Sequence, residues 1–523
     1  MTVPAHVALD LRALVGIGAC VAIAACAPAM PRLDGAPGAP PAPSSLWPVP
    51  SAARTPLPAA APPAASAASR ALTSDSATAA AGQMLSLVDV MDVALRNNPQ
   101  TRQSWALARA SVNDYGSSRG ALYPTVNATV DFTQSNNALG TITGTQFTPG
   151  QLDTAGSLAS RSGIGASRRS QIAPIVSLSY LIWDLGSRRG AIESAKQTAI
   201  AANLTHNVTV QNVVLQVEST LFSFLTTRAL RDAQIVAVQE AQADTAASEE
   251  RFRVGVATLE EVLQTRTALA QARFQLASLE GSVLAARGNL AAAMGLPANA
   301  RFDVPNIDAR EQICAVAASV DTLINRAIAL RPEISQARAQ AASLAAQVRV
   351  ARAAGYPALT LTSSASYTTS NAVNASGRNL VLVFGVQIPV FNGFSRQYDV
   401  RSAREQYNAG LAQVSSTEQQ VTVQVFASYA ELQAATQKIS AAEELLRSAQ
   451  QSSDVAVGRY REGVGTIVDV LLGRSALATA RADEIQARWE WHTALAQLAH
   501  DVGTIDVAGR PNLPLASGAD ARR

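Results

Sequence analysis

Side chains that often do chemistry are few in this chain and are not grouped. The four histidines are His6 in the N-terminal leader, His206 alone in a long helical stretch, and His492 and His500 in the last such stretch. None has the spacing of a metal site or a catalytic triad, and a lone histidine is more often a packing or surface residue. The sequence therefore predicts that the protein is not an enzyme and uses no cofactor and no metal.

The basic residues argue against nucleotide hydrolysis and nucleic-acid binding. Lys196 and Lys438 are the only lysines, and neither follows a glycine-rich loop, so no P-loop can form. The net charge is +3 over 523 residues, and the charges are dispersed along helical stretches. Nucleic acid is not expected as a partner.

Cys26 is a candidate for covalent modification. A largely apolar run over 13–25 is too short to span a bilayer as a mature helix and is typical of a secretory signal. It ends in Ile, Ala, Ala and Cys at 23–26, which resembles a bacterial lipobox, while Cys20 offers a poorer frame because it leaves a shorter run. The sequence predicts a signal peptide over 1–25 and an acyl anchor at Cys26; an ordinary signal peptide with an incidental cysteine is the alternative.

Residues 26–84 begin with a segment rich in proline and alanine. The stretch from 27 to 71 holds 12 of the 24 prolines. Such a composition predicts a semi-rigid spacer that builds no core. Cys314 would be the one unmodified cysteine of the mature chain, so we expect no intramolecular disulfide and a small buried hydrophobic residue there.

The sequence segments that should form helices and strands occur twice. Residues 251–273 return at 459–481, displaced by 208, with 13 of 23 positions identical. Upstream the offset is 233, which leaves about 25 extra residues in a Gly-, Ser- and Thr-rich loop within 135–170 of the first copy. The pattern predicts repeats over 85–295 and 321–503, a connecting segment over 296–320 and a tail over 504–523.

Each repeat contains a predicted β-hairpin. Apolar residues alternate with small or polar ones over 125–132 and 359–367, and again over 176–182 and 384–390. Strands of roughly ten residues with one apolar face are typical of transmembrane β-strands, although a soluble sheet is the alternative. Open strand edges are not tolerated in hydrocarbon, so several chains must share one barrel, and three chains give 12 strands.

Long helices follow each hairpin. Residues 188–254 and 395–462 are almost free of Pro and Gly, and each stretch is followed by a turn and a second helical stretch. At ~1.5 Å per residue the longer helices reach roughly 100 Å, far beyond ordinary globular helices. The alanine-rich pattern predicts antiparallel coiled hairpins; an alanine-rich soluble bundle is the alternative.

Together these features resemble the TolC family of outer-membrane efflux proteins. The match covers about 85–503 and rests on four paired motifs: the helix starts Asn98-Pro99 and Arg331-Pro332, the strand entries Tyr123-Pro124 and Tyr356-Pro357, the strand exits at 183–186 and 391–393, and two Arg-Phe/Tyr-x-x-Gly turns. The resemblance implies an α+β membrane protein: a homotrimer whose 12-stranded outer-membrane β-barrel, four strands per chain, continues into a periplasmic α-helical coiled-coil tunnel.

The resemblance also implies partners and a docking site. The protein would be the passive exit duct of a tripartite export system, joined by a periplasmic adaptor protein to an inner-membrane pump or ABC exporter. Gly255 and Thr258 in one turn, and Gly463 and Thr466 in the other, would form the periplasmic tip where the adaptor docks.

A periplasmic gate is implied close to these turns. Asp469 matches an acidic ring position of the family, but the next ring position, acidic in the best-known member, is Leu472 here. Three symmetric carboxylates around a tunnel axis would attract cations.

The lock of this gate also differs from the best-known member. Gly465 stands where that member has a basic residue, and a glycine cannot form a salt bridge. We expect Glu261 facing Tyr460, or Glu260 reaching Arg461, to replace the lock.

The cargo is open at this stage. Lipidation at Cys26 would be similar to the multidrug-efflux branch and favours small toxic molecules; the alternative is a protein exported by a type I secretion system. A coiled-coil structural protein of the envelope is a candidate of another class, but it leaves the alternating strands unexplained.

Overall fold

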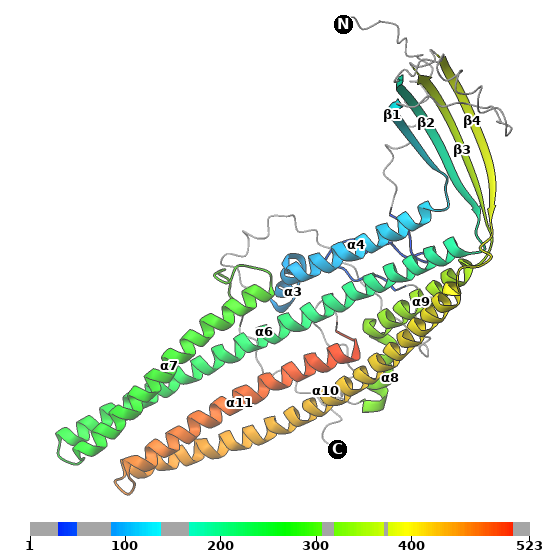
Figure 1. Ribbon diagram of the computed structural model, residues 1–523. Helices are drawn as coiled ribbons and strands as arrows, with labels where there is room; N and C mark the ends of the chain where they lie inside the picture. The colour runs from blue at the N-terminus through cyan, green and yellow to red at the C-terminus, as the bar shows by residue number, and fades with distance from the viewer. Residues whose placement is uncertain (1–29, 50–84, 138–166, 306–317, 371–374, 506–523) are drawn as a thin grey trace, which may run out of the picture. The chain divides into compact units, whose positions relative to one another are not determined.

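The computed structural model of the protein describes residues 30–49, 85–137, 167–305, 318–370 and 375–505. Two compact units are present: Tyr115–Ala195 with Ala342–Asn408 form the one that contains the strands, and the rest of the chain forms the other. The elements in chain order are α3 (Leu87–Asn97), α4 (Pro99–Gly120), β1 (Thr125–Asn137), β2 (Ser167–Trp183), α6 (Ser187–Arg253), α7 (Leu259–Ala293), α8 (Val320–Leu330), α9 (Pro332–Ala353), β3 (Ala358–Ser370), β4 (Ala375–Gln387), α10 (Ser395–Arg461) and α11 (Ile467–Val502) (Figure 1).

The order of the elements confirms the duplication. Two short helices, a hairpin and two long helices occur twice, and α6 and α10 each have 67 residues. Pro99 and Pro332 open the second helix of each copy, where the missing N–H costs no hydrogen bond. The residues before them, Asn98 and Arg331, are extended with ψ of 127° and 126°, as a following proline favours.

The four strands form one antiparallel sheet in the order β1-β2-β3-β4. β1 and β4 are therefore the two edges of the sheet within one chain. The strands have 13 to 17 residues and are longer than the roughly ten predicted. Backbone pairing continues past the end of the apolar alternation, for example at Ser135↔Arg169, because the ladder needs only N–H and C=O groups.

The apolar face of this sheet is not covered by the other described elements of its chain. Val130, Phe132, Leu380 and Phe384 are all exposed in the single chain. No helix in the described ranges combines the length and hydropathy of a membrane span.

The long helices pack into two hairpins, which two clusters of buried residues stabilise. Buried residues of α3, α6 and α7, among them Leu221, Leu225 and Met294, form one cluster together with Trp489 of α11. A second cluster joins α8 to α10 and α11 around Leu323 and Trp491.

Residues 30–49 are here called the N-terminal strap. Their packing contradicts the prediction that this segment is a spacer that builds no core. Leu33 and Trp47 are fully buried. The Trp47 backbone N–H donates to Asn207 Oδ1 over 2.7 Å, and Asn203 Nδ2 and Trp105 Nε1 donate to carbonyls of the strap. Proline lacks an N–H but keeps its carbonyl, so a proline-rich segment offers acceptors that side-chain donors of a neighbouring helix can satisfy.

Candidate functional site: the two helix tips

The turns that end the two hairpins have the same backbone geometry. Gly255 and Gly463 have φ of +80° and +76°. The N–H of the next residue bonds back to Arg251 O in one turn and to Arg459 O in the other, both over 2.9 Å. This is a Schellman cap, whose left-handed position favours glycine. A Cβ at either glycine would meet nothing within 4 Å, so both glycines face open space. Glycine is therefore favoured by the backbone conformation and not by a lack of room for a side chain.

Threonines start the returning helices. Thr258 Oγ1 accepts from the Glu261 N–H, and Thr466 Oγ1 accepts from the Asp469 N–H over 3.2 Å. Asp469 Oδ2 accepts in return from Thr466 N and Oγ1, which completes a capping box. These hydrogen bonds lower the pKa of Asp469, so this exposed carboxylate is ionised at neutral pH.

Two hydrogen bonds join the two tips. Tyr460 Oη donates to Glu261 Oε2 over 3.1 Å, so these two side chains are in contact. The Arg251 guanidinium lies 4.6 Å from the centroid of the Tyr460 ring and donates to Tyr460 O. Burial, followed by the Glu261 carboxylate, raises the pKa of Tyr460, which therefore stays a protonated donor.

The alternative lock does not form. Glu260 accepts from Gln264 Nε2 in its own helix, and within the described ranges no ion pair joins it to Arg461. Helical spacing places Gln264 one turn away, which satisfies Glu260 locally. A Cβ at Gly465 would lie 3.1 Å from Arg459 Cβ, so this turn leaves little room for a longer side chain at that position.

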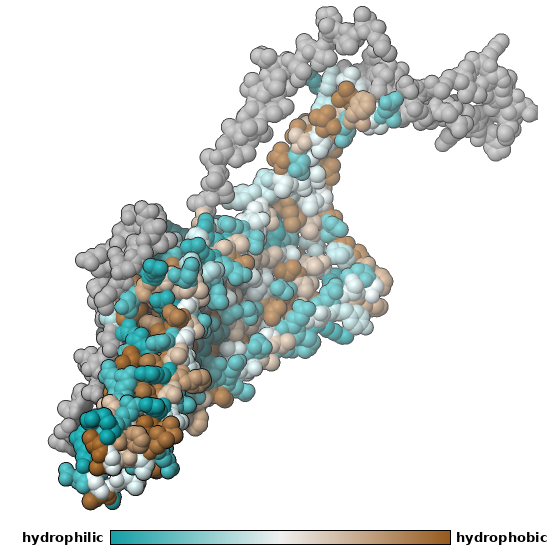
Figure 2. Space-filling view, turned by 90° about the vertical axis from the view of Figure 1, so that its left-hand side faces the viewer, coloured by the Kyte–Doolittle hydropathy of each residue, from teal (hydrophilic) through white to brown (hydrophobic). Residues whose placement is uncertain are grey.

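Apolar side chains surround both tips. Val254, Val256, Leu259, Val464 and Leu472 are 56% to 67% exposed. Figure 2 shows hydrophobic residues among hydrophilic ones at the lower end of the molecule, where the turns lie. A group of exposed apolar side chains is typical of a surface that another protein covers.

Arg251 was not identified as a site residue from the sequence. Its contact with Tyr460 joins residues 209 positions apart, which no local pattern reveals. The available signal was the Arg-aromatic pair in both copies of the turn, because guanidinium groups pack well on aromatic rings.

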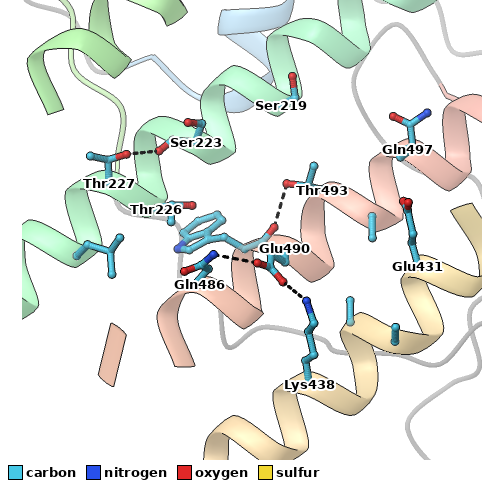
Figure 3. Close-up of a pocket in the computed structure, with 15 residues that line it drawn as sticks. Ser219, Ser223, Thr226, Thr227, Glu431, Lys438, Gln486, Glu490, Thr493 and Gln497 are labelled. Carbon is cyan, nitrogen blue, oxygen red and sulfur yellow. Dashed lines mark hydrogen bonds and ion pairs between the residues drawn. The ribbon is translucent and has the colours of Figure 1, made fainter. Parts of the chain in front are cut away.

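A hollow of about 710 Å³ lies between α6, α10 and α11 (Figure 3). Lys438 Nζ lies 3.0 Å from Glu490 Oε2, and Gln486 Nε2 donates to Glu490 Oε1. The hollow is otherwise lined mainly by hydroxyl, amide and alanine side chains. The ion pair with Lys438 and the hydrogen bond from Gln486 satisfy the Glu490 carboxylate within the hollow.

The histidines of the long helices have structural contacts. His206 lies between Ser104 Oγ and Ser45 O, and His500 lies between Asn212 Oδ1 and Asp501. Both are buried, and desolvation lowers the pKa of His206. No group of three potential metal ligands occurs in the described part of the chain.

The sequence matches a known family over most of its length. The family model described as outer membrane efflux protein matches residues 90–296 and 323–504, so the chain belongs to the outer membrane efflux protein family. It is a non-enzymatic transport protein of the TolC type, a channel of the outer membrane that extends into the periplasm.

Individual relatives are distant but cover most of the chain. Protein CyaE of Bordetella pertussis is 25% identical over 82% of this chain and 86% of its own. The pyoverdine export outer membrane protein OpmQ of Pseudomonas aeruginosa is 28% identical over 64% and 69%. The structure of the outer membrane protein VceC of Vibrio cholerae has a TM-score of 0.66 at 19% identity and covers 80% of this chain and 96% of its own. The fold class predicted for the chain, four strands and long helices in two repeats, is confirmed.

Proposed function

We propose that the protein is the passive exit duct of a tripartite system that exports small toxic molecules. The observation that carries the proposal is the pair of helix tips: two near-identical turns, each with an exposed glycine and an apolar rim, that no other part of the described chain covers. OpmQ, whose name states pyoverdine export, supports a small cargo.

The sheet and the family membership support a homotrimer. Within the described residues β1 and β4 each leave one edge of the sheet unpaired, and such edges cost several kcal/mol per unpaired group in hydrocarbon. Three copies would join β4 of one chain to β1 of the next and give the predicted 12-stranded barrel.

The two tips are proposed to dock a periplasmic adaptor, which connects the duct to an inner-membrane pump. Gly255 and Gly463 permit close approach because they carry no side chain, and Thr258 and Thr466 fix the helices that leave the turns. Exposed valines beside them offer apolar area to a partner helix.

The gate is proposed to close at the same level. The Tyr460–Glu261 bond holds the two hairpins of a chain together, and Asp469 supplies a negative charge from each chain. Leu472 is exposed and would narrow the opening by an apolar side chain.

Cys26 lies outside the described residues and is proposed to carry the acyl anchor. Only residues 27–29 separate it from the docked strap, which would keep the anchor close to the body of the protein.

Deletion of the gene in the native bacterium tests the function. We expect ethidium to accumulate in the mutant cells and wild-type protein to restore its efflux, whereas a variant with bulky residues at both tips should not. Unchanged ethidium accumulation together with loss of a secreted protein from the medium would support the type I secretion alternative.

A further inference from the structure

The end of strand β2 carries a tryptophan that a β-bulge turns to the apolar face of the sheet. The pairing of β2 with β3 runs as far as Leu181↔Thr360 and shifts by one residue before Trp183↔Leu359. Without the shift, Trp183 would lie on the same face as Leu181 and Thr360. With it, Trp183 shares the apolar face with Leu359, which pairs in turn with Val386 of β4. The bulge therefore adds an indole, 56% exposed, to the apolar face where the sheet meets the helices.

Two tyrosines stand at the same end of the sheet. Tyr123 and Tyr356 each come two residues before a strand, because β1 begins at Thr125 and β3 begins at Ala358. Both strands are neighbours of β2, and the two tyrosines are 67% and 55% exposed. Tryptophan and tyrosine are enriched where a membrane protein passes from hydrocarbon to water. This end of the sheet therefore marks the membrane surface on the side of the long helices, which is the periplasmic side.

Exposed arginines follow these aromatic residues closely along the chain. Arg119 and Arg352 are the second-last residues of α4 and α9, six positions before the strands, and they are equivalent in the two repeats at the 233-residue offset. Arg189 comes six positions after the last residue of β2. All three arginines are exposed, and in the described part of the chain none of them forms an ion pair. The neighbouring Arg188 differs, because it is only 15% exposed and pairs with Asp184.

The position of Arg189 is electrostatically unfavourable unless an anion from outside the chain compensates it. Positive partial charge gathers at the N-terminus of a helix. Arg188 and Arg189 are the second and third residues of α6, and the first turn of this helix has no acidic residue. Asp184 offsets the charge of Arg188, whereas Arg189 has no carboxylate partner among the described residues. Arg119 and Arg352 suit the C-termini of their helices, so Arg189 is the residue that indicates an external anion.

We propose that this end of β2 binds the headgroup of an anionic phospholipid in the membrane leaflet that faces the periplasm. The site, here called the β2 collar, consists of Arg119, Arg189, Arg352 and Trp183. A guanidinium group donates two parallel N–H bonds to phosphate oxygens, and the indole packs against the acyl chain below the headgroup. The exposed apolar face of the sheet continues this lipid contact into the hydrocarbon. The collar lies within one chain and is independent of the exported cargo.

Quenching of Trp183 fluorescence by brominated lipids tests the collar. All five tryptophans lie in the described residues, and Trp183 alone is exposed. Full-length trimers are placed in bilayers of phosphatidylethanolamine and phosphatidylglycerol in which one of the two lipids is brominated, and Trp183→Phe gives the background. We expect phosphatidylglycerol to be enriched about five- to tenfold at Trp183, the order expected for one or two arginines per headgroup. The enrichment should fall at high salt, because the arginines are exposed.

Substitutions separate the collar from a general attraction of lipid to a basic protein. The triple variant Arg119→Gln, Arg189→Gln and Arg352→Gln should show no enrichment. The matched control is Arg273→Gln in α7, which removes an exposed arginine that has no ion pair in the described ranges and should keep the full enrichment. If the triple variant does not insert, the three single variants are measured, and each should lower the enrichment.

Three results would overturn the collar. They are equal quenching by the two lipids in the wild type, unchanged enrichment in the inserted arginine variants, and an equal loss in Arg273→Gln. A wild-type protein that binds phosphatidylglycerol but does not restore export would instead contradict the proposed function and leave the collar intact.

Discussion

At the scale of single residues, the two tips use equivalent acidic side chains differently. Asp469 and Glu261 both stand three positions after the threonine that starts their helix. The shorter Asp469 folds back onto Thr466, and Glu261, one methylene longer, accepts the Tyr460 hydroxyl of the other hairpin. Asp469 thus caps its own helix and keeps an exposed negative charge, whereas Glu261 joins the two hairpins by a hydrogen bond.

Asp469→Asn is expected to lower the cation selectivity of the channel in planar bilayers. The pKa of Asp469 is lower in the folded protein than the ordinary value of 3.8. The negative charge, and any stability that it adds, is therefore fully present above pH 3.8 and is lost only as the pH falls through the lower pKa of the folded protein. Wild-type selectivity should therefore be constant from neutral pH to about pH 4. Equal selectivity of the variant and the wild type would place the gate charge elsewhere.

Tyr460→Phe, combined with Arg461→Glu, is expected to raise the conductance. Tyr460→Phe removes the hydrogen bond to Glu261, which contributes about 1 kcal/mol per chain, and leaves the ring under Arg251. Because Arg461 has no ion pair to Glu260, most of the effect should come from Tyr460→Phe alone. Tyr429→Phe, in the same helix, removes only a local bond with Gln433 and serves as the control. If the double variant keeps the wild-type conductance, the constriction lies at Leu472 instead.

At the scale of elements, the tip turns combine a backbone requirement with a docking surface. Replacing both Gly255 and Gly463 with Val forces a β-branched residue to positive φ and costs roughly 1–2 kcal/mol per turn. Asn tolerates this conformation, so Gly255→Asn with Gly463→Asn adds side chains and keeps the turns. We expect the Asn variant to form trimers but to lose adaptor crosslinking and export. If crosslinking is retained, the glycines serve only the conformation of the turns and not docking.

The N-terminal strap gives a second prediction for an element. Trp47→Ala removes a fully buried indole, a change that typically costs ~3–5 kcal/mol. Because the strap contacts the helices along its length, we expect it to detach as a unit. Hydrogen exchange should rise over 30–49 and remain at the wild-type level in α10. Exchange that rises equally throughout the helices would mean that the strap is part of the global core.

The elements were predictable where a period repeats and less so where the contact is distant. Hairpins and long helices follow from alternation and from the absence of Pro and Gly, and the fold is confirmed. The docking of the strap was not predictable, since proline content suggests a spacer and gives no sign of the Asn203 and Asn207 side chains that bind it. Likewise, the sequence predicted a contact between Tyr460 and Glu261 through the family, but not the packing of Arg251 on the same ring.

At the scale of the whole molecule, the strands and the lipid would attach the protein to the membrane independently. Cys26→Ser should abolish acyl labelling and leave trimers that insert, because the sheet of three chains spans the bilayer. Labelling of the wild type at Cys26 is the required control. Wild-type protein that is cleaved elsewhere and carries no acyl group would reject the lipid anchor.

The equal length of α6 and α10 restricts how this protein can evolve. Inserting one residue into a helix rotates everything beyond it by about 100° and advances it by ~1.5 Å. Such an insertion would break the ion pair between Glu240 and Arg474 and the contacts nearer the tip. Such a change survives only if the neighbouring helices change with it. Between the strands there is no such restriction: residues 138–166 join β1 to β2, whereas 371–374 suffice between β3 and β4. Differences in length among relatives should therefore collect in the strand connections, and helix length should vary only in matched steps of all four long helices.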